Sequence, residues 1–99
     1  MTIPKSVKVG GKTYKVEITD RLALGSANCA GEILYDQLTI RILPNPEQMM
    51  HYVLLHEIVH AMLQNHGYRD HDEQKVDELA NALHALIVDN PEMFGRGRL

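Results

Sequence analysis

The stretch HEIVH, residues 56 to 60, has the residue types and spacing of a metal-dependent hydrolytic site. His56 and His60 are four residues apart, so on a helix their rings project from one face and can bind the same metal ion. Glu57 is turned about 100° from His56, where its carboxylate can reach a water on the metal. Zinc lowers the pKa of a bound water toward about 7. The pattern therefore predicts hydrolysis with Glu57 as general base.

The residues around the HEIVH motif help to decide whether it is a metal site or a chance occurrence of the pattern. The motif falls within an apolar stretch that predicts a buried helix, and two buried histidines without a metal are costly unless they are hydrogen-bonded. A hydrogen-bonded histidine pair in a metal-free core is the alternative.

Three residues compete to be the third metal ligand. His66 is six residues beyond His60, but on a continuous helix it would lie about 9 Å along the axis and about 120° around from it. His71 can reach the site if the connection between the helices folds inward. Glu73 precedes Val76 by three residues, at the margin of an apolar stripe, and is expected to face the first helix. This placement favours Glu73.

Asp77 lies four residues after Glu73 and shares its helix edge. It can accept a hydrogen bond from the distal nitrogen of a metal-bound histidine, a contact that such ligands usually make. Glu78 points into solvent. The structural alternatives are a capping role for Glu73 and a solvated charge for Asp77.

The residues before the motif predict strands. Apolar residues alternate with polar ones on both sides of Gly10 and Gly11, a pair typical of a hairpin turn, and again around a turn near Asp36. Residues 1 to 45 are therefore expected to form a small antiparallel sheet of three to four strands.

Two helices are expected after the sheet. The first, over residues 46 to 66, has Asn45 as N-cap and Gly67 at its end, and its apolar residues surround it, so it should be buried on nearly all sides. The second, over residues 70 to 90, begins with Asp70 as cap and ends before Pro91, which leaves residues 91 to 99 as a tail. The prediction is one α+β domain over residues 1 to 99.

Composition excludes several classes of protein. A net charge of −3 without a basic cluster argues against a nucleic-acid partner, and no apolar run is long enough for a membrane span. The single cysteine, Cys29, cannot form an intramolecular disulfide, and the first residues lack the apolar segment of a secretory signal. We expect a cytoplasmic protein; its oligomeric state is not predicted.

The motif HEIVH followed by EQKVDELANAL resembles the gluzincin zinc peptidases, whose third ligand is a glutamate in an E-x-x-x-D pattern on a following helix. Glu73 and Asp77 match that pattern. Over residues 31 to 90 the chain is most similar to ImmA/IrrE-type metallopeptidase domains and to minigluzincins, small proteins common in phages and prophages. The resemblance implies a zinc-dependent peptidase in which His56, His60 and Glu73 bind zinc and Asp77 supports them.

The resemblance also implies that residues 28 to 35 frame a cleft and pair with an extended peptide, and that residues 91 to 99 can block it. Cys29 could approach the zinc as a fourth, inhibitory ligand. Tyr68, His71 and His84 are the candidates for stabilising the transition state. The alternative function is a zinc-stabilised binding or regulatory module without catalysis, and a metal-free partner-binding domain is a third hypothesis.

Overall fold

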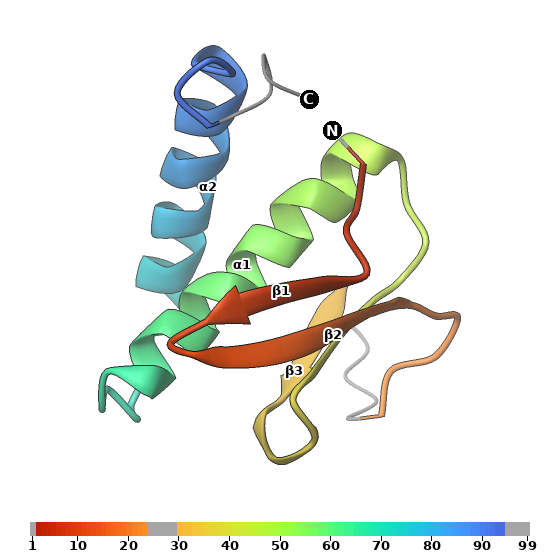
Figure 1. Cartoon of the computed structure of the whole chain (residues 1–99), viewed down its shortest axis with the longest axis vertical. Coiled ribbons are helices and arrows are strands. Elements are labelled where there is room, and N and C mark those ends of the chain that lie inside the picture. Colours follow the sequence, from red (N-terminus) through yellow and green to blue (C-terminus); the bar gives the residue numbers. More distant parts are fainter. Residues whose placement is uncertain (1, 24–29, 95–99) are drawn as a thin grey trace.

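The computed structural model describes residues 2–23 and 30–94, and it confirms an α+β fold with four strands followed by two helices (Figure 1). The elements in chain order are β1 (Ser6–Val9), β2 (Lys12–Ile18), β3 (Gly31–Leu34), the short 3₁₀ helix η1 (Tyr35–Gln37), β4 (Thr39–Ile42), α1 (Glu47–Asn65) and α2 (Glu73–Asp89). Cys29 and the last five residues of the expected tail lie outside the described residues. Part of the predicted cleft-framing segment, residues 28 and 29, lies outside them as well.

The sheet has the strand order β1-β2-β4-β3 and is mixed. The pairs β1–β2 and β3–β4 are antiparallel, but β2 and β4 run parallel, so the expectation of an antiparallel sheet is wrong for this central pair. Side-chain alternation reports which face of a strand is buried and does not report the direction of its neighbour. Ile40 and Ile42 on β4 are completely buried, which explains why β4 occupies an inner position and β3 the edge.

The predicted turns are present. Gly10 and Gly11 have φ angles of 60° and 80° and connect β1 to β2, a conformation that glycine adopts without strain. Asp36 lies in η1, between β3 and β4, as expected. Leu38 follows in the left-handed region with φ 49°.

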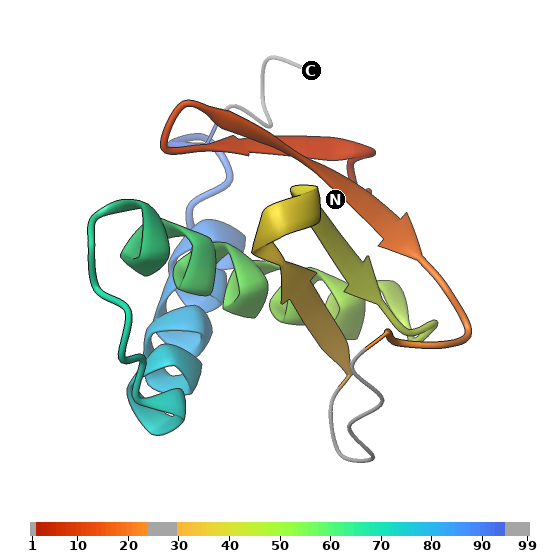
Figure 2. The same cartoon turned by 90° about the horizontal axis from the view of Figure 1, so that it is seen from below.

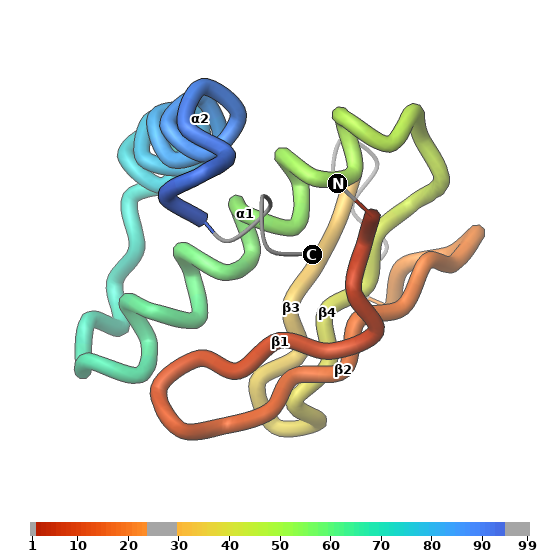
Figure 3. The backbone as a smooth tube through the Cα atoms, turned by 45° about the horizontal axis from the view of Figure 1, so that its top comes forward, coloured from red at the N-terminus to blue at the C-terminus, as the bar shows by residue number. Residues whose placement is uncertain are grey.

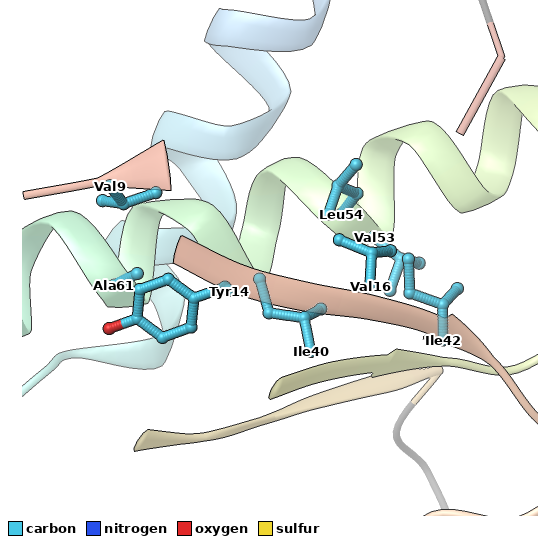
Figure 4. Packing of buried hydrophobic residues seen from close by; sticks show 8 residues of the cluster. All are labelled: Val9, Tyr14, Val16, Ile40, Ile42, Val53, Leu54 and Ala61. Atoms are coloured by element: carbon cyan, nitrogen blue, oxygen red, sulfur yellow. The ribbon is translucent and has the colours of Figure 1, made fainter. Parts of the chain in front are cut away.

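One face of the sheet packs against α1, and α2 packs against the other side of α1 (Figure 2). The main core cluster joins the strands to this helix (Figure 4); its buried members are Val9, Tyr14, Val16, Ile40, Ile42, Val53, Leu54 and Ala61. A smaller cluster of Val59, Val76 and Ala80 joins α1 to α2. The middle of α1 is therefore enclosed as predicted, whereas Met49 and Met62 near its ends are 53% and 37% exposed.

Asn65 fixes the C-terminal end of α1 against the β1–β2 hairpin. Its side chain accepts a hydrogen bond from Lys12 Nζ at 2.7 Å and donates to the hydroxyl of Tyr14 at 3.3 Å. A side chain at Gly10 would collide with Asn65, because an added Cβ would lie 2.7 Å from Asn65 Cβ. The hairpin thus holds the helix that carries the HEIVH motif.

The helix boundaries agree with the predictions to within three residues, but both predicted caps are wrong. Pro46, not Asn45, is the N-cap of α1, and the Asn45 amide instead donates to the carbonyl of Leu43. Asp72, not Asp70, caps α2, and its carboxylate accepts from the backbone N–H groups of residues 74 and 75. A cap is decided by the local backbone, and several acidic or amide residues near each helix start could fill the position.

The end of α1 is formed as predicted by Gly67, which has a φ angle of 90°. The N–H groups of Gly67 and Tyr68 donate to the carbonyls of Gln64 and Leu63, the paired bonds that close a helix when the next residue is left-handed. The chain then turns back toward α2. Figure 3 shows α1 between β3 and α2, the two elements that complete the site.

Candidate metal centre

His56 and His60 lie one turn apart on α1, with ring centroids 5.1 Å apart, and both direct Nε2 toward Glu73 on α2. The distance from His56 Nε2 to Glu73 Oε1 is 3.3 Å, and from His60 Nε2 to Glu73 Oε2 it is 3.0 Å. One possible ligand atom from each residue lies within 4.8 Å of the others. These three residues, predicted from the sequence, form a group that could hold a metal ion.

Glu73 is available for this contact because another residue caps the helix. It is the first residue of α2, and the carboxylate of Asp72 accepts the bonds from the first free N–H groups. The capping role considered for Glu73 is therefore taken by its neighbour. The side chain of Glu73 is 71% exposed, so its position depends on how α2 is docked and on the two histidines.

Asp77 lies on the far side of the His56 ring from Glu73. Its Oδ1 is 3.5 Å from His56 Nδ1, while His56 Nε2 faces Glu73. The same carboxylate accepts a hydrogen bond from the hydroxyl of Tyr52. Asp77 thus has the contact with the distal histidine nitrogen that its spacing predicted, and Tyr52, which the sequence reasoning missed, holds it. The available signal was that Tyr52 precedes His56 by one helical turn.

Glu57 is buried, with 6% of its surface exposed. Burial raises the pKa of its carboxyl group to about 8, and the nearby charges of Glu73 and Glu32 act in the same direction. A carboxyl group with so perturbed a pKa beside three possible metal ligands is typical of a functional site.

Gly31 at the start of β3 allows the sheet edge to approach Glu57 closely. A Cβ added at Gly31 would lie 2.5 Å from Val53 Cγ1 and 3.5 Å from Glu57 Oε2. The first distance is too short for any side chain unless α1 or β3 shifts. The requirement for glycine at this position follows from this contact, which the sequence did not reveal.

Glu32, the next residue on β3, is a second buried carboxylate at the site. The N–H of Ala23 donates to its Oε2 at 2.6 Å, and Arg41 Nη1 lies 3.9 Å from the same oxygen. Its negative charge contributes to the raised pKa of Glu57. No sequence pattern pointed to Glu32, because its role depends on the pairing of β2 with β4 that leaves β3 at the sheet edge.

Two cavities meet at the candidate metal centre, one of about 670 Å³ and one of about 300 Å³. Both are lined by Gly31, His56, Glu57 and Glu73. The larger cavity continues between β3 and the connection from α1 to α2, and Tyr35 lines it. The smaller lies on the Asp77 side. His56 and Glu73 are therefore accessible from both cavities, and His60 from the larger one.

The other sequence candidates take different positions. His66 is the exposed C-cap of α1 and is not in the metal-binding group, so the geometry does not favour it as third ligand. His71 is also outside that group, but its Nδ1 is 2.7 Å from Nδ1 of His60. Tyr68 is 66% exposed, and His84 packs against His51 and Tyr52. Neither Tyr68 nor His84 lines the two cavities, whereas His71 lines the larger one.

The electrostatics of His60 suit metal binding. Burial lowers the pKa of His60, with the nearby His56 and His71 acting in the same direction and Glu73 opposing them. A lowered pKa keeps the imidazole neutral at pH 7, and a neutral imidazole is the form that binds a metal.

No protein-family model matches the chain, and no match is found among curated proteins or among solved structures. The resemblance to gluzincins therefore stays a prediction from the two motifs. No helix in residues 2–23 and 30–94 combines the length and apolar character needed to cross a membrane.

Proposed function

We propose that the protein is a zinc-dependent peptidase in which His56, His60 and Glu73 hold the metal and Glu57 is the general base. One observation carries the proposal. A buried carboxyl group, Glu57, lies beside three converging metal-binding side chains in the wall of a cavity. A purely structural metal site has no use for an additional carboxyl group there.

The donor set fits zinc. Two imidazole nitrogens and one carboxylate oxygen are ligands that zinc accepts, and three protein ligands leave a position for water, as in catalytic zinc sites. The lowered pKa of His60 favours its neutral form, and the contact of His56 Nδ1 with Asp77 favours a lone pair on Nε2 of His56. When bound, zinc would lower the pKa of a water toward about 7 and polarise a peptide carbonyl.

In the proposed reaction Glu57 transfers a proton from the attacking water to the leaving amide nitrogen. Without a metal its carboxyl group is mostly protonated at pH 7, because its pKa is about 8. A divalent cation beside it favours the ionised form, so in the loaded protein the carboxylate can accept a proton from the attacking water. The same group then gives that proton to the leaving amide nitrogen, which completes the cleavage of the bond.

Tyr35 is the residue that we propose as hydrogen-bond donor to the developing oxyanion. It lines the larger cavity with His56, Glu57 and His60. Burial raises the pKa of Tyr35 to about 12, with the charge of Glu57 acting in the same direction, so its hydroxyl keeps its proton at working pH. Loss of one such donor typically reduces kcat by about 10²- to 10³-fold.

The Tyr35→Phe variant tests this role. We expect kcat to fall by about this factor with KM and bound zinc unchanged. The control is Tyr14→Phe, which removes a buried hydroxyl outside both cavities. Equal kcat values for the two variants would exclude Tyr35 as the donor.

The geometry favours an extended peptide as substrate. β3 is the edge strand, so among the described strands one side of it is left unpaired, and three of its residues line the larger cavity. An extended peptide can add to such an edge by backbone hydrogen bonds while a side chain enters the cavity.

The test of the proposed function is a comparison of the native protein with Glu57→Gln. Zinc per chain is measured by elemental analysis, and cleavage of a mixed peptide library is followed by mass spectrometry. We expect about one zinc per chain for both proteins, and cleavage that is about 10²- to 10⁴-fold slower for the variant. Absence of zinc, or equal cleavage by both proteins, would contradict the proposal.

One observation favours a second function, a zinc-stabilised binding module. α2 buries only Val76 and Ala80 along its length, so a metal that bridges the two helices would add much of the stability of their contact. The same experiment distinguishes the two functions. Zinc binding without cleavage by the native protein would support the module.

A further inference from the structure

The connection between α1 and α2 places His71 directly against His60. The left-handed Gly67 turns the chain back, and the two imidazole rings meet edge to edge, with centroids 5.0 Å apart and planes 22° apart. The Nδ1 atoms of the two rings are 2.7 Å apart. His71 is half-buried at the wall of the larger cavity, so it touches a candidate ligand without belonging to the metal-binding group.

The second ring nitrogen of His71 identifies its tautomer. Nε2 of His71 is hydrogen-bonded to the backbone carbonyl of Tyr68. A carbonyl oxygen can only accept, so the proton of this bond belongs to Nε2 of His71. A neutral imidazole with its proton on Nε2 has a lone pair on Nδ1. His71 therefore presents an acceptor to His60.

The tautomer of His60 follows from the same contact. A hydrogen bond between two Nδ1 atoms needs one proton, and His71 supplies only a lone pair, so Nδ1 of His60 is the donor. Nε2 of His60 lies 3.0 Å from Glu73 Oε2, a carboxylate oxygen that also only accepts, so without a metal Nε2 competes with Nδ1 for the proton. A metal ion held by Nε2 and Glu73 would remove this competition and leave the His60 proton on Nδ1.

We propose that His71 is a positioning residue that fixes His60 in its metal-binding tautomer. This inference deepens the proposed zinc centre and depends on it for its functional meaning. His56 and His60 are then held by different chemistry, a carboxylate at Asp77 and an imidazole nitrogen at His71. The Tyr68 carbonyl orients His71, so the connection between the helices is part of the site.

The tautomers are tested first in the zinc-loaded protein, by long-range ¹H–¹⁵N correlation spectra of the histidine rings. We expect the proton on Nδ1 of His60 and on Nε2 of His71. In His71→Ala the acceptor is absent, and the Nδ1 proton of His60 should exchange faster with water. In His71→Asn an amide oxygen replaces the acceptor, and slow exchange of the Nδ1 proton should be retained.

The second measurement is zinc affinity, by competition with a chromophoric chelator. We expect His71→Ala to weaken zinc binding by about 10- to 100-fold, as loss of a hydrogen-bond partner of a ligand typically does, and His71→Asn to restore most of it. The matched control is His66→Ala, which removes an exposed histidine at the end of α1 and should leave the affinity unchanged.

Three results would overturn the proposal: a proton on Nδ1 of His71 in the zinc-loaded native protein, equal zinc affinities for His71→Ala and His66→Ala, or direct coordination of zinc by His71 in the loaded spectrum. Absence of zinc binding by the native protein would instead refute the proposed function, and the functional role of His71 with it. The two failures are distinguishable because zinc binding by the native protein is measured separately from its change in His71→Ala.

Discussion

The two helices contribute to the candidate metal centre from different environments. On α1, Glu57 and His60 are buried and packed between the sheet and α2, and the hairpin holds the end of that helix. On α2, the side chains of Glu73 and Asp77 are 71% and 54% exposed. The α1 half is therefore preorganised by the core, whereas the α2 half is placed by a helix contact that buries only Val76 and Ala80 of α2 and by its contacts with the histidines. A bound metal would add most to the second half.

The largest expected effect is on the stability of the metal-free protein, and it comes from Glu57 in the α1 half. The folded-state pKa of Glu57, about 8, is above its ordinary value of 4.5. The folded protein therefore keeps a proton that the unfolded chain has released, and its stability is complete below about pH 4.5 and is lost as the pH rises to about 8. We expect a loss on the order of a few kcal/mol in the free energy of unfolding.

Urea unfolding in the presence of a chelator, at pH 5 and at pH 9, measures this loss. The Glu57→Gln variant has no group to ionise at this position, so its stability should change much less between the two pH values. Parallel pH profiles for the native protein and the variant would show that Glu57 titrates normally.

The next effect is the stabilisation that zinc gives through the α2 half. Zinc at about 100 times its Kd should raise the free energy of unfolding by about 2.7 kcal/mol in the native protein. Glu73→Ala should lose most of this gain at the same zinc concentration, because the metal then no longer connects the two helices. Glu78→Ala, an exposed carboxylate on the same helix, is the control and should keep the full gain. A zinc response that survives Glu73→Ala would assign the third ligand to another residue.

A third prediction tests how α2 is docked. Val76 is 1% exposed and packs against Val59, whereas Leu79 on the same helix is 49% exposed. Val76→Ala should lower the free energy of unfolding by about 1 to 2 kcal/mol in the metal-free protein, and Leu79→Ala by less than about 0.5 kcal/mol. Chemical denaturation of both variants measures the difference. Similar losses would mean that α2 packs through a different face.

The smallest effect is expected for Tyr52, which connects the two halves through its hydrogen bond to Asp77. Tyr52→Phe should cost about 1 kcal/mol in zinc binding, roughly a fivefold weaker affinity, because the bond is partly replaced by water at this exposed carboxylate. Tyr14→Phe is the control, since its hydroxyl bonds to Asn65 outside the site. Equal affinities for the native protein and Tyr52→Phe would show that Asp77 needs no support.

The parts of the site that the sequence predicted are those set by local geometry. The spacing of His56 and His60 on one helix face, and of Glu73 and Asp77 on one helix edge, follows from helical periodicity, and the structure brings these residues together. Both helices and the three to four strands expected before them were predicted from apolar periodicity for the same reason, and the structure has four strands.

The parts that were missed depend on which elements become neighbours. Glu32 reaches the site because β3 is the edge strand next to α1, and the parallel pairing of β2 with β4 produces that order. Asp72 and not Asp70 is the N-cap of α2, because the local backbone conformation decides where the helix begins. The contact of His71 with His60 depends on the path of the connection after Gly67. Periodicity contains no information on any of these.

Gly31 also has a consequence for the acidity of Glu57. The pKa of Glu57 is raised mainly by the exclusion of water, and the bare backbone of Gly31 is part of what excludes it. A methyl group at position 31 would collide with Val53 and separate β3 from α1. Water would then reach the carboxyl group and lower its pKa toward 4.5. One hydrogen atom in place of a methyl group, on a strand that carries no proposed ligand, thus tunes the proton affinity of the proposed base.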